Sequence, residues 1–187
     1  MFINCSSSKE KYVPHSTSPK NAPEALAVRN VLRKLFKHKK REYSQIGIIT
    51  PYASQVHCIQ STLRESGFPV KTNKGPIEDE DESSSDEVNM DVDVHWRLMQ
   101  TPPPKAIEVN TVDGFQGREK DIIILSTVRA NHEGTVGFLS DWRRFNVSMT
   151  RAKHALIVVG HQATLQNDPI WKTWLEWIRI NEMKSTL

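Results

Sequence analysis

The sequence predicts an α/β fold in which helices cover both faces of a parallel sheet. Short, wholly apolar segments alternate along the chain with segments of helical periodicity, for example Ile46–Thr50 (IGIIT), 122–128 (IIILSTV) and 155–159 (ALIVV). Strands this apolar have no face suited to water, as expected where helices cover both sides of a sheet. The 187 residues suffice for one domain with a full core, whereas two independent domains would each be small.

The first half of the chain predicts two strands, each followed by a helix. Residues 1–5 form an apolar run typical of a buried strand. Asn21 is a candidate helix N-cap, and Glu24 in the first turn favours the helix dipole. Apolar residues then recur at helical spacing, and the basic cluster 37–41 closes this helix. The strand 46–50 follows, and a second amphipathic helix ends at Gly67.

The second half predicts three more strands and two helices. Strands are expected at 107–112, 122–128 and 155–159, and helices at 142–151 and after Pro169. Between the halves, residues 71–105 combine an acidic and serine-rich run with three consecutive prolines. A compact domain seldom needs a loop this long, so we expect a disordered insertion with a short ordered piece around 96–99.

The charge is unevenly distributed. Nine acidic residues and no Lys or Arg lie between Ile77 and Val94. Without those nine, 25 Lys and Arg face 13 acidic residues, a surplus of 12 positive charges where the whole chain carries +3. This balance favours a polyanionic partner, although a soluble basic surface would give the same count.

Several classes of protein are disfavoured. Cys5 and Cys58 lack paired spacing, and the seven histidines show no metal-ligand periodicity, so neither a disulfide nor a metal site is expected. No apolar run approaches the roughly 20 residues that cross a bilayer, and the first residues do not have the pattern of a secretion signal. We therefore expect an intracellular protein, nuclear or cytoplasmic, with no membrane partner.

Polar residues follow directly on buried strands in three segments. These are 49–55 (ITPYASQ), 109–131 (VNTVDGFQGREKDIIILSTVRAN) and 143–160 (RRFNVSMTRAKHALIVVG). In order, they resemble motifs IV, V and VI of superfamily 1 helicases, in the branch that contains the nonsense-mediated-decay helicase and senataxin. The resemblance implies a single RecA-like domain of the P-loop NTPase type over residues 1–187, interrupted by the insertion 71–105. The loops after the parallel strands are expected to open on one edge of the sheet.

The resemblance further implies the second half of an ATP-dependent motor, in which ATP binds between two RecA-like halves. Arg151, on the motif VI helix, would act as an arginine finger on the γ-phosphate. Gly117 would let the backbone approach the nucleotide, and Glu119 would accept hydrogen bonds from ribose hydroxyls. The phosphate-binding loop and the Mg²⁺ ligands would come from the first half. Outside the motifs, Arg151 and Glu119 would be taken for ordinary surface charges.

The resemblance also implies contacts with single-stranded RNA or DNA. Thr111 and Val112 would offer a hydroxyl and an amide to the phosphate backbone. Thr50 and Gln55 would contact the phosphate backbone in the same way. Lys153 would hold the motif VI helix in place or touch phosphate. Tyr52 is a candidate for base stacking, but its helical spacing suits a core role equally well. Such contacts do not distinguish RNA from DNA.

Some features of the family pattern are absent. The sequence holds no GxxxxGK[ST] loop, no acidic DExx-type motif and no QYRMHP-like segment. We therefore expect a chain that starts inside the domain and is inactive alone; a fragment, a truncated form and a genuine short protein all fit. The alternative function is a non-catalytic binding module that recruits a protein partner through the acidic insertion. On either interpretation, that insertion is a candidate competitor of nucleic acid for the basic surface.

Overall fold

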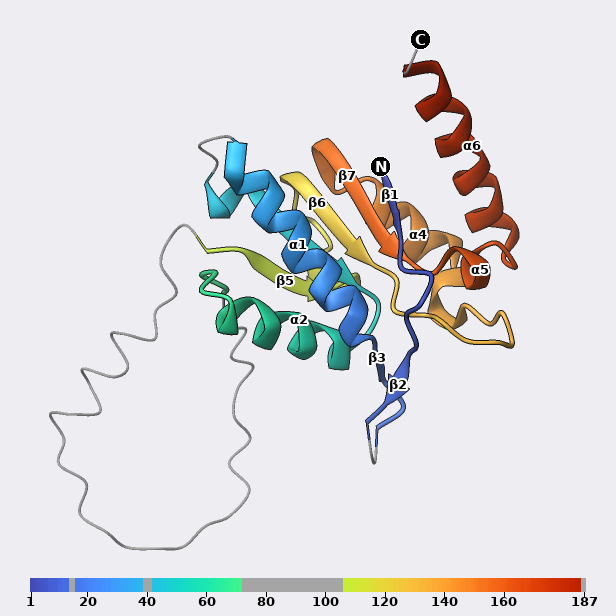
Figure 1. The fold of residues 1–187 in the computed structure, drawn as a ribbon, viewed down its shortest axis with the longest axis horizontal. Coiled ribbons are helices and arrows are strands. Elements are labelled where there is room, and N and C mark those ends of the chain that lie inside the picture. The colour runs from blue at the N-terminus through green and yellow to red at the C-terminus, as the bar shows by residue number, and fades with distance from the viewer. Residues whose placement is uncertain (14–15, 39–41, 72–105, 186–187) are drawn as a thin grey trace, which may run out of the picture.

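The computed structural model describes residues 1–13, 16–38, 42–71 and 106–185. Their centre is a five-stranded sheet in the order β1-β7-β6-β4-β5, and every strand pair in it is parallel (Figure 1). The strands are β1 (Phe2–Asn4), β4 (Ile46–Thr50), β5 (Glu108–Thr111), β6 (Lys120–Ser126) and β7 (Ala152–Gly160). The predicted α/β fold with a parallel sheet is confirmed, and it is the RecA-like architecture.

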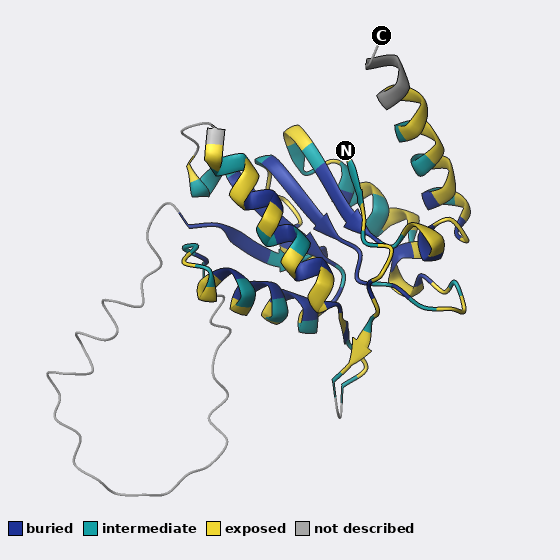
Figure 2. Cartoon of the chain, in the orientation of Figure 1, coloured by how far each residue is buried: buried dark blue, intermediate teal, exposed yellow. Residues whose placement is uncertain are grey.

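Helices cover both faces of this sheet. On one face, α1 (Ala22–His38) and α2 (Ala53–Glu65) pack their apolar residues, such as Leu32 and Ile59, against β4, β6 and β7. On the other face, a second core surrounds Phe115 and Trp171 and includes α4 (Trp142–Met149), α5 (Gln162–Leu165) and the start of α6 (Pro169–Ser185). Figure 2 shows the strands buried between these layers, while α6 extends away from the body and is mostly exposed.

The residues predicted to start α1 and to end α2 do so in the structure. The side-chain oxygen of Asn21 accepts a hydrogen bond of 3.2 Å from the Glu24 amide, so Asn21 caps α1 as expected. Gly67, just beyond α2, has φ +80°, a conformation that glycine adopts without steric cost. The short hairpin of β2 (Lys11–Tyr12) and β3 (Pro19–Lys20) was not predicted, because neither strand has an apolar pattern.

Strand and helix limits differ from the prediction in the second half. The strand expected at 122–128 is β6, which begins and ends two residues earlier, and β7 extends the expected strand 155–159 at both ends. The helix expected at 142–151 ends at Met149. Three 3-10 turns, η1 (Tyr43–Gln45), η2 (Asp113–Phe115) and η3 (Gly137–Ser140), fill the connections.

The predicted insertion 71–105 lies almost wholly outside the described residues, which resume at Ala106. Its two flanks pair with each other: the Lys71 amide donates to the Ile107 carbonyl at 2.9 Å, and the Ile107 amide donates to the Pro69 carbonyl at 2.8 Å. Both cysteines are free and half-buried. In the part of the chain that the structure describes, no helix is long and apolar enough to cross a membrane.

Candidate functional site

The predicted site residues fall on two opposite edges of the sheet. At the carboxyl edge, where the strands end, Thr50 lies opposite Thr111. At the amino edge, where β6 and β7 begin, Lys120 lies opposite Ala152, and Gly117, Glu119 and Arg151 immediately precede them. The seven residues of β6 separate the edges by about 20 Å. The loops after β4, β5 and β7 begin at one edge, as expected, whereas Gly117, Glu119 and Arg151 directly precede β6 or β7 and so lie at the opposite edge.

One backbone hydrogen bond joins the two motif segments at the amino edge. The Lys120 amide donates to the Arg151 carbonyl at 3.1 Å, which places the residues that precede β6 beside Arg151. Gly117 is exposed and has φ +73°, with no atom within 4 Å of the position a Cβ would take. The neighbouring Glu119 is also exposed. The loop thus combines a backbone conformation suited to glycine with open space in front of it, which fits the approach of a ligand.

Arg151 lies just beyond α4 and not on it. The helix ends at Met149, and Thr150 closes it by donating its amide to the Asn146 carbonyl at 3.1 Å. The guanidinium of Arg151 folds back on this helix end: Nε donates to the Val147 carbonyl at 3.2 Å, and Nη2 donates to the Thr150 hydroxyl at 3.0 Å. These two bonds use two of the five N–H donors of the guanidinium, so the others can still donate to phosphate oxygens.

A buried carboxylate holds the amino edge together, and the sequence analysis missed it. Glu108, at the start of β5, is 2% exposed. It forms ion pairs with Arg118 Nη1, with Lys120 Nζ at 3.5 Å and with Lys71 Nζ at 3.9 Å. Arg118 lies between Gly117 and Glu119 in the sequence, so its ion pair with Glu108 anchors this loop to β5. The available signal was an acidic residue between the apolar Ile107 and Val109, ten residues before Arg118.

The carboxyl edge offers fewer donors than predicted. The Thr111 hydroxyl oxygen accepts from the Gly114 amide at 3.1 Å and is only partly buried, so its hydrogen can still turn outward. The Val112 amide is already used, because it donates to the Thr50 carbonyl at 3.1 Å. Thr50 is fully buried. Of these three residues, only Thr111 reaches the surface, so the proposed strand contact rests on Thr111.

The structure places the side chain of Gln55 in the interior and not on the surface. The side chain is fully buried; its Oε1 accepts from the Asn21 amide at 2.8 Å, and its Nε2 donates to the Asn21 carbonyl at 3.0 Å and to Ser126 Oγ at 3.1 Å. Both donors of this buried amide are used within the chain, so none is left for a strand on the surface. Gln55 instead connects α2 to the start of α1 and the end of β6.

Glu24 completes this internal network. Its Oε2 accepts from the Ser126 hydroxyl at 2.7 Å and from the Val128 amide at 2.9 Å. The side chain is fully buried, and the loss of solvation raises its pKa to about 8 in spite of these donors. The network joins α1 to the end of β6, where Val128 takes the unusual φ of +72°.

Two further predicted residues are placed clearly. Lys153 is exposed at the start of β7, two residues after Arg151, and so lies at the amino edge and not beside Thr111. Tyr52 is 4% exposed and precedes the first turn of α2, which favours its core role over base stacking.

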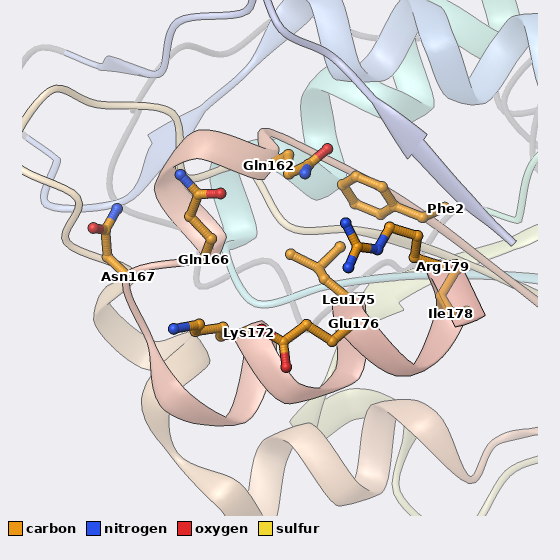
Figure 3. Close-up of a pocket in the computed structure, with 9 residues that line it drawn as sticks. All are labelled: Phe2, Gln162, Gln166, Asn167, Lys172, Leu175, Glu176, Ile178 and Arg179. Carbon is orange, nitrogen blue, oxygen red and sulfur yellow. The ribbon is translucent and has the colours of Figure 1, made fainter. Parts of the chain in front are cut away.

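A cavity outside the candidate site lies beside the C-terminal helices. It has a volume of about 590 Å³ and lies between β1, α5 and α6 (Figure 3). Its walls combine apolar side chains, such as Phe2 and Leu175, with charged ones, such as Lys172 and Arg179. None of the predicted site residues lines it, so it has no part in the candidate site.

Comparison with known proteins gives consistent relatives. The family described as "AAA domain" matches residues 1–163. The chain is similar to Probable helicase MAGATAMA 3 of Arabidopsis thaliana (40% identical, covering 71% of this chain and 12% of that protein). It is also similar to Regulator of nonsense transcripts 1 of Dictyostelium discoideum (37% identical, covering 92% and 10%) and to ATP-dependent helicase NAM7 of Saccharomyces cerevisiae (34% identical, covering 87% and 14%). The chain thus spans between 10% and 14% of the length of these relatives.

Proposed function

Since the chain belongs to the superfamily 1 helicases, in the branch of the nonsense-mediated-decay helicase and senataxin, we propose that it is the second, C-terminal motor half of an ATP-dependent RNA or DNA helicase. In this function the amino edge completes an ATP site, and the carboxyl edge guides a single strand. The partner is the first RecA-like half of the same motor, which supplies the phosphate-binding loop and the Mg²⁺ ligands.

The observation that carries the proposal is the hydrogen bond between the Lys120 amide and the Arg151 carbonyl. It holds the residue that would neutralise the γ-phosphate next to the loop that would meet the ribose. The guanidinium of Arg151 would compensate charge on the equatorial oxygens as the transition state forms, a role worth about 10³ to 10⁵ in rate in related phosphoryl transfers. Glu119 would accept hydrogen bonds from the ribose hydroxyls, and Gly117 would leave the nucleotide room.

Thr111 supports the role of the carboxyl edge. Its hydroxyl lies at the end of β5 and can donate to a backbone phosphate, a contact that positions a strand and reads no sequence. The basic surplus outside the segment Ile77 to Val94 favours the same ligand. Contacts of this kind suit RNA and DNA alike.

A second candidate is a binding module without hydrolysis, which recruits nucleic acid or protein. One observation favours it: two of the five N–H donors of the Arg151 guanidinium are directed at Val147 and Thr150 of the same chain, as they would be in a domain that meets no nucleotide. The two candidates differ in whether the domain supports turnover of ATP.

A domain exchange tests the proposal. The 187-residue chain replaces the homologous segment of NAM7, and ATP hydrolysis by the chimera is measured with and without a single-stranded oligonucleotide. We expect hydrolysis that the strand stimulates, within about tenfold of the parent. A chimera that folds and binds the strand, yet hydrolyses no ATP, would contradict the motor function and favour the binding module.

A further inference from the structure

The carboxyl edge bears exposed aromatic rings that the three motifs do not account for. Phe138 in η3 is 57% exposed, and Trp142 at the start of α4 is 62% exposed. Two arginines lie against these rings: Arg144 Cζ is 5.0 Å from the Phe138 centroid, and Arg143 Cζ is 5.9 Å from the Trp142 ring. We call Phe138, Trp142, Arg143 and Arg144 the aromatic surface.

Phe138 is held in place by the loops that follow three strands. Its ring packs on Tyr52, beyond β4, with a centroid separation of 5.7 Å. The Arg144 guanidinium beside it is fixed by Asp113, beyond β5, with Nη2 to Oδ2 at 3.1 Å. Arg129, beyond β6, donates to the Tyr52 hydroxyl at 3.3 Å. These contacts hold the ring at the edge that carries Thr111.

Trp142 gives the surface its second ring. The side chain of Asp141 caps α4 by accepting from the Arg143 amide at 2.9 Å, which fixes the backbone beneath the indole. Glu10 pairs with Arg129, and Asp113 with Arg144, whereas no carboxylate of the described residues pairs with Arg143. The charge available to a ligand is therefore positive and lies beside the indole.

We propose that the aromatic surface stacks the bases of a single-stranded nucleic acid whose backbone passes Thr111. The inference rests on the proposed function and adds to it the residues that hold the bases. Bases of every kind present a π-face, so stacking on Phe138 and Trp142 is tolerant of sequence, and the guanidinium of Arg143 adds cation–π and phosphate attraction. Grooves that bind single strands combine exposed aromatic side chains with cationic ones, as Trp142 and Arg143 do here.

The test measures how tightly the 187-residue chain binds a labelled single-stranded oligonucleotide and an abasic oligomer of the same length. Fluorescence anisotropy is recorded for the wild type, Phe138→Ala and Trp142→Ala over a range of salt concentrations. Because one stacked base contributes about 1–3 kcal/mol, we expect each variant to bind the oligonucleotide about 5- to 160-fold more weakly. Binding of the abasic oligomer should be unchanged. Trp177→Ala is the matched control, since Trp177 is 59% exposed on α6.

Charge is separated from stacking by Arg143→Ala, which should lower the slope of log affinity against log salt by about one for both ligands. Affinity of Phe138→Ala and Trp142→Ala equal to that of the wild type would overturn the aromatic surface and leave the proposed function standing. An equal loss for the abasic oligomer would also overturn it, because bases would then have no part. Variants that bind the strand normally but fail to associate with the first motor half would make the surface a protein interface. A wild-type chain that binds no strand would overturn this surface together with the proposed strand contacts.

Discussion

Replacement of Glu108 by glutamine should destabilise the domain and loosen the loop around Gly117. The substitution keeps the size of the side chain and removes the negative charge from a residue that is 2% exposed. Its three cationic partners differ in exposure: the side chain of Lys120 is 16% exposed, that of Lys71 39% and that of Arg118 54%. The free-energy cost of losing the carboxylate therefore differs among the three ion pairs.

The magnitude follows from those exposures. Lys71 and Arg118 can turn toward water, so the loss of each pair should cost between zero and about 1 kcal/mol. Lys120 is mostly buried and keeps only its bond to the Ser44 carbonyl at 2.9 Å, so its uncompensated charge should cost about 1–2 kcal/mol. The total is about 2 kcal/mol. In a domain of this size that lowers the Tm by roughly 4–8 °C.

Thermal and urea unfolding of Glu108→Gln and the wild type measure this cost. Glu176→Gln, at an exposed position on α6, is the matched control and should stay within about 0.5 kcal/mol of the wild type. Amide hydrogen exchange at Gly117 and Arg118 should be faster in Glu108→Gln alone. A stability for Glu108→Gln within 0.5 kcal/mol of the wild type, with unchanged exchange, would refute the assignment of Glu108 as the anchor of this loop.

Three further perturbations test the packing. Burial raises the pKa of Glu24 from 4.5 to about 8, so the stability that its protonated form contributes is complete below pH 4.5 and is lost as the pH rises through about 8. Chemical unfolding between pH 5 and 8 should therefore show the wild type losing stability faster than Glu24→Gln. Parallel curves for the two proteins would contradict this. Gly47→Ala places a methyl group 2.6 Å from Phe115 Cζ and should cost about 1–3 kcal/mol in urea unfolding, whereas an unchanged midpoint would show a looser core. Trp171→Ala removes a side chain that is 1% exposed together with its bond to the Leu139 carbonyl, and should cost about 3–5 kcal/mol; a loss below 1 kcal/mol would refute its place in the core.

The parallel sheet could be predicted because its strands are uniformly apolar. Ile46–Thr50 was predicted to the residue, since Pro51 follows it directly and every one of its residues is buried. The start of β7 was predicted three residues too late, because Lys153 and His154 are polar and exposed. In the structure, Ala152 already pairs with Lys120. Pairing across a sheet extends strands beyond their apolar cores, and a single segment of sequence does not show its partner.

The candidate site was predicted less well, for a similar reason. Gln55 follows a strand and is polar, which suggested a surface contact, but its partners Asn21 and Ser126 are 34 and 71 residues away and bury it. Glu108 is buried by partners from both sides of the insertion, Lys71 and Arg118. Burial of a polar side chain depends on such distant partners, and no local pattern encodes them. Gly117, Glu119 and Arg151 were named from motifs, and the structure adds that they share the amino edge.

The central claim is that Arg151 acts on ATP across the interface between two motor halves. In the chimera with NAM7, Arg151→Ala should lower the strand-stimulated turnover number by about 10³ or more and leave strand affinity within about twofold, because the guanidinium acts on charge that develops in the transition state. Arg33→Ala, an exposed arginine on α1, should change neither quantity. A turnover number within a few-fold of the unmodified chimera, or an equal loss of strand affinity, would contradict the assignment of Arg151 to the ATP site.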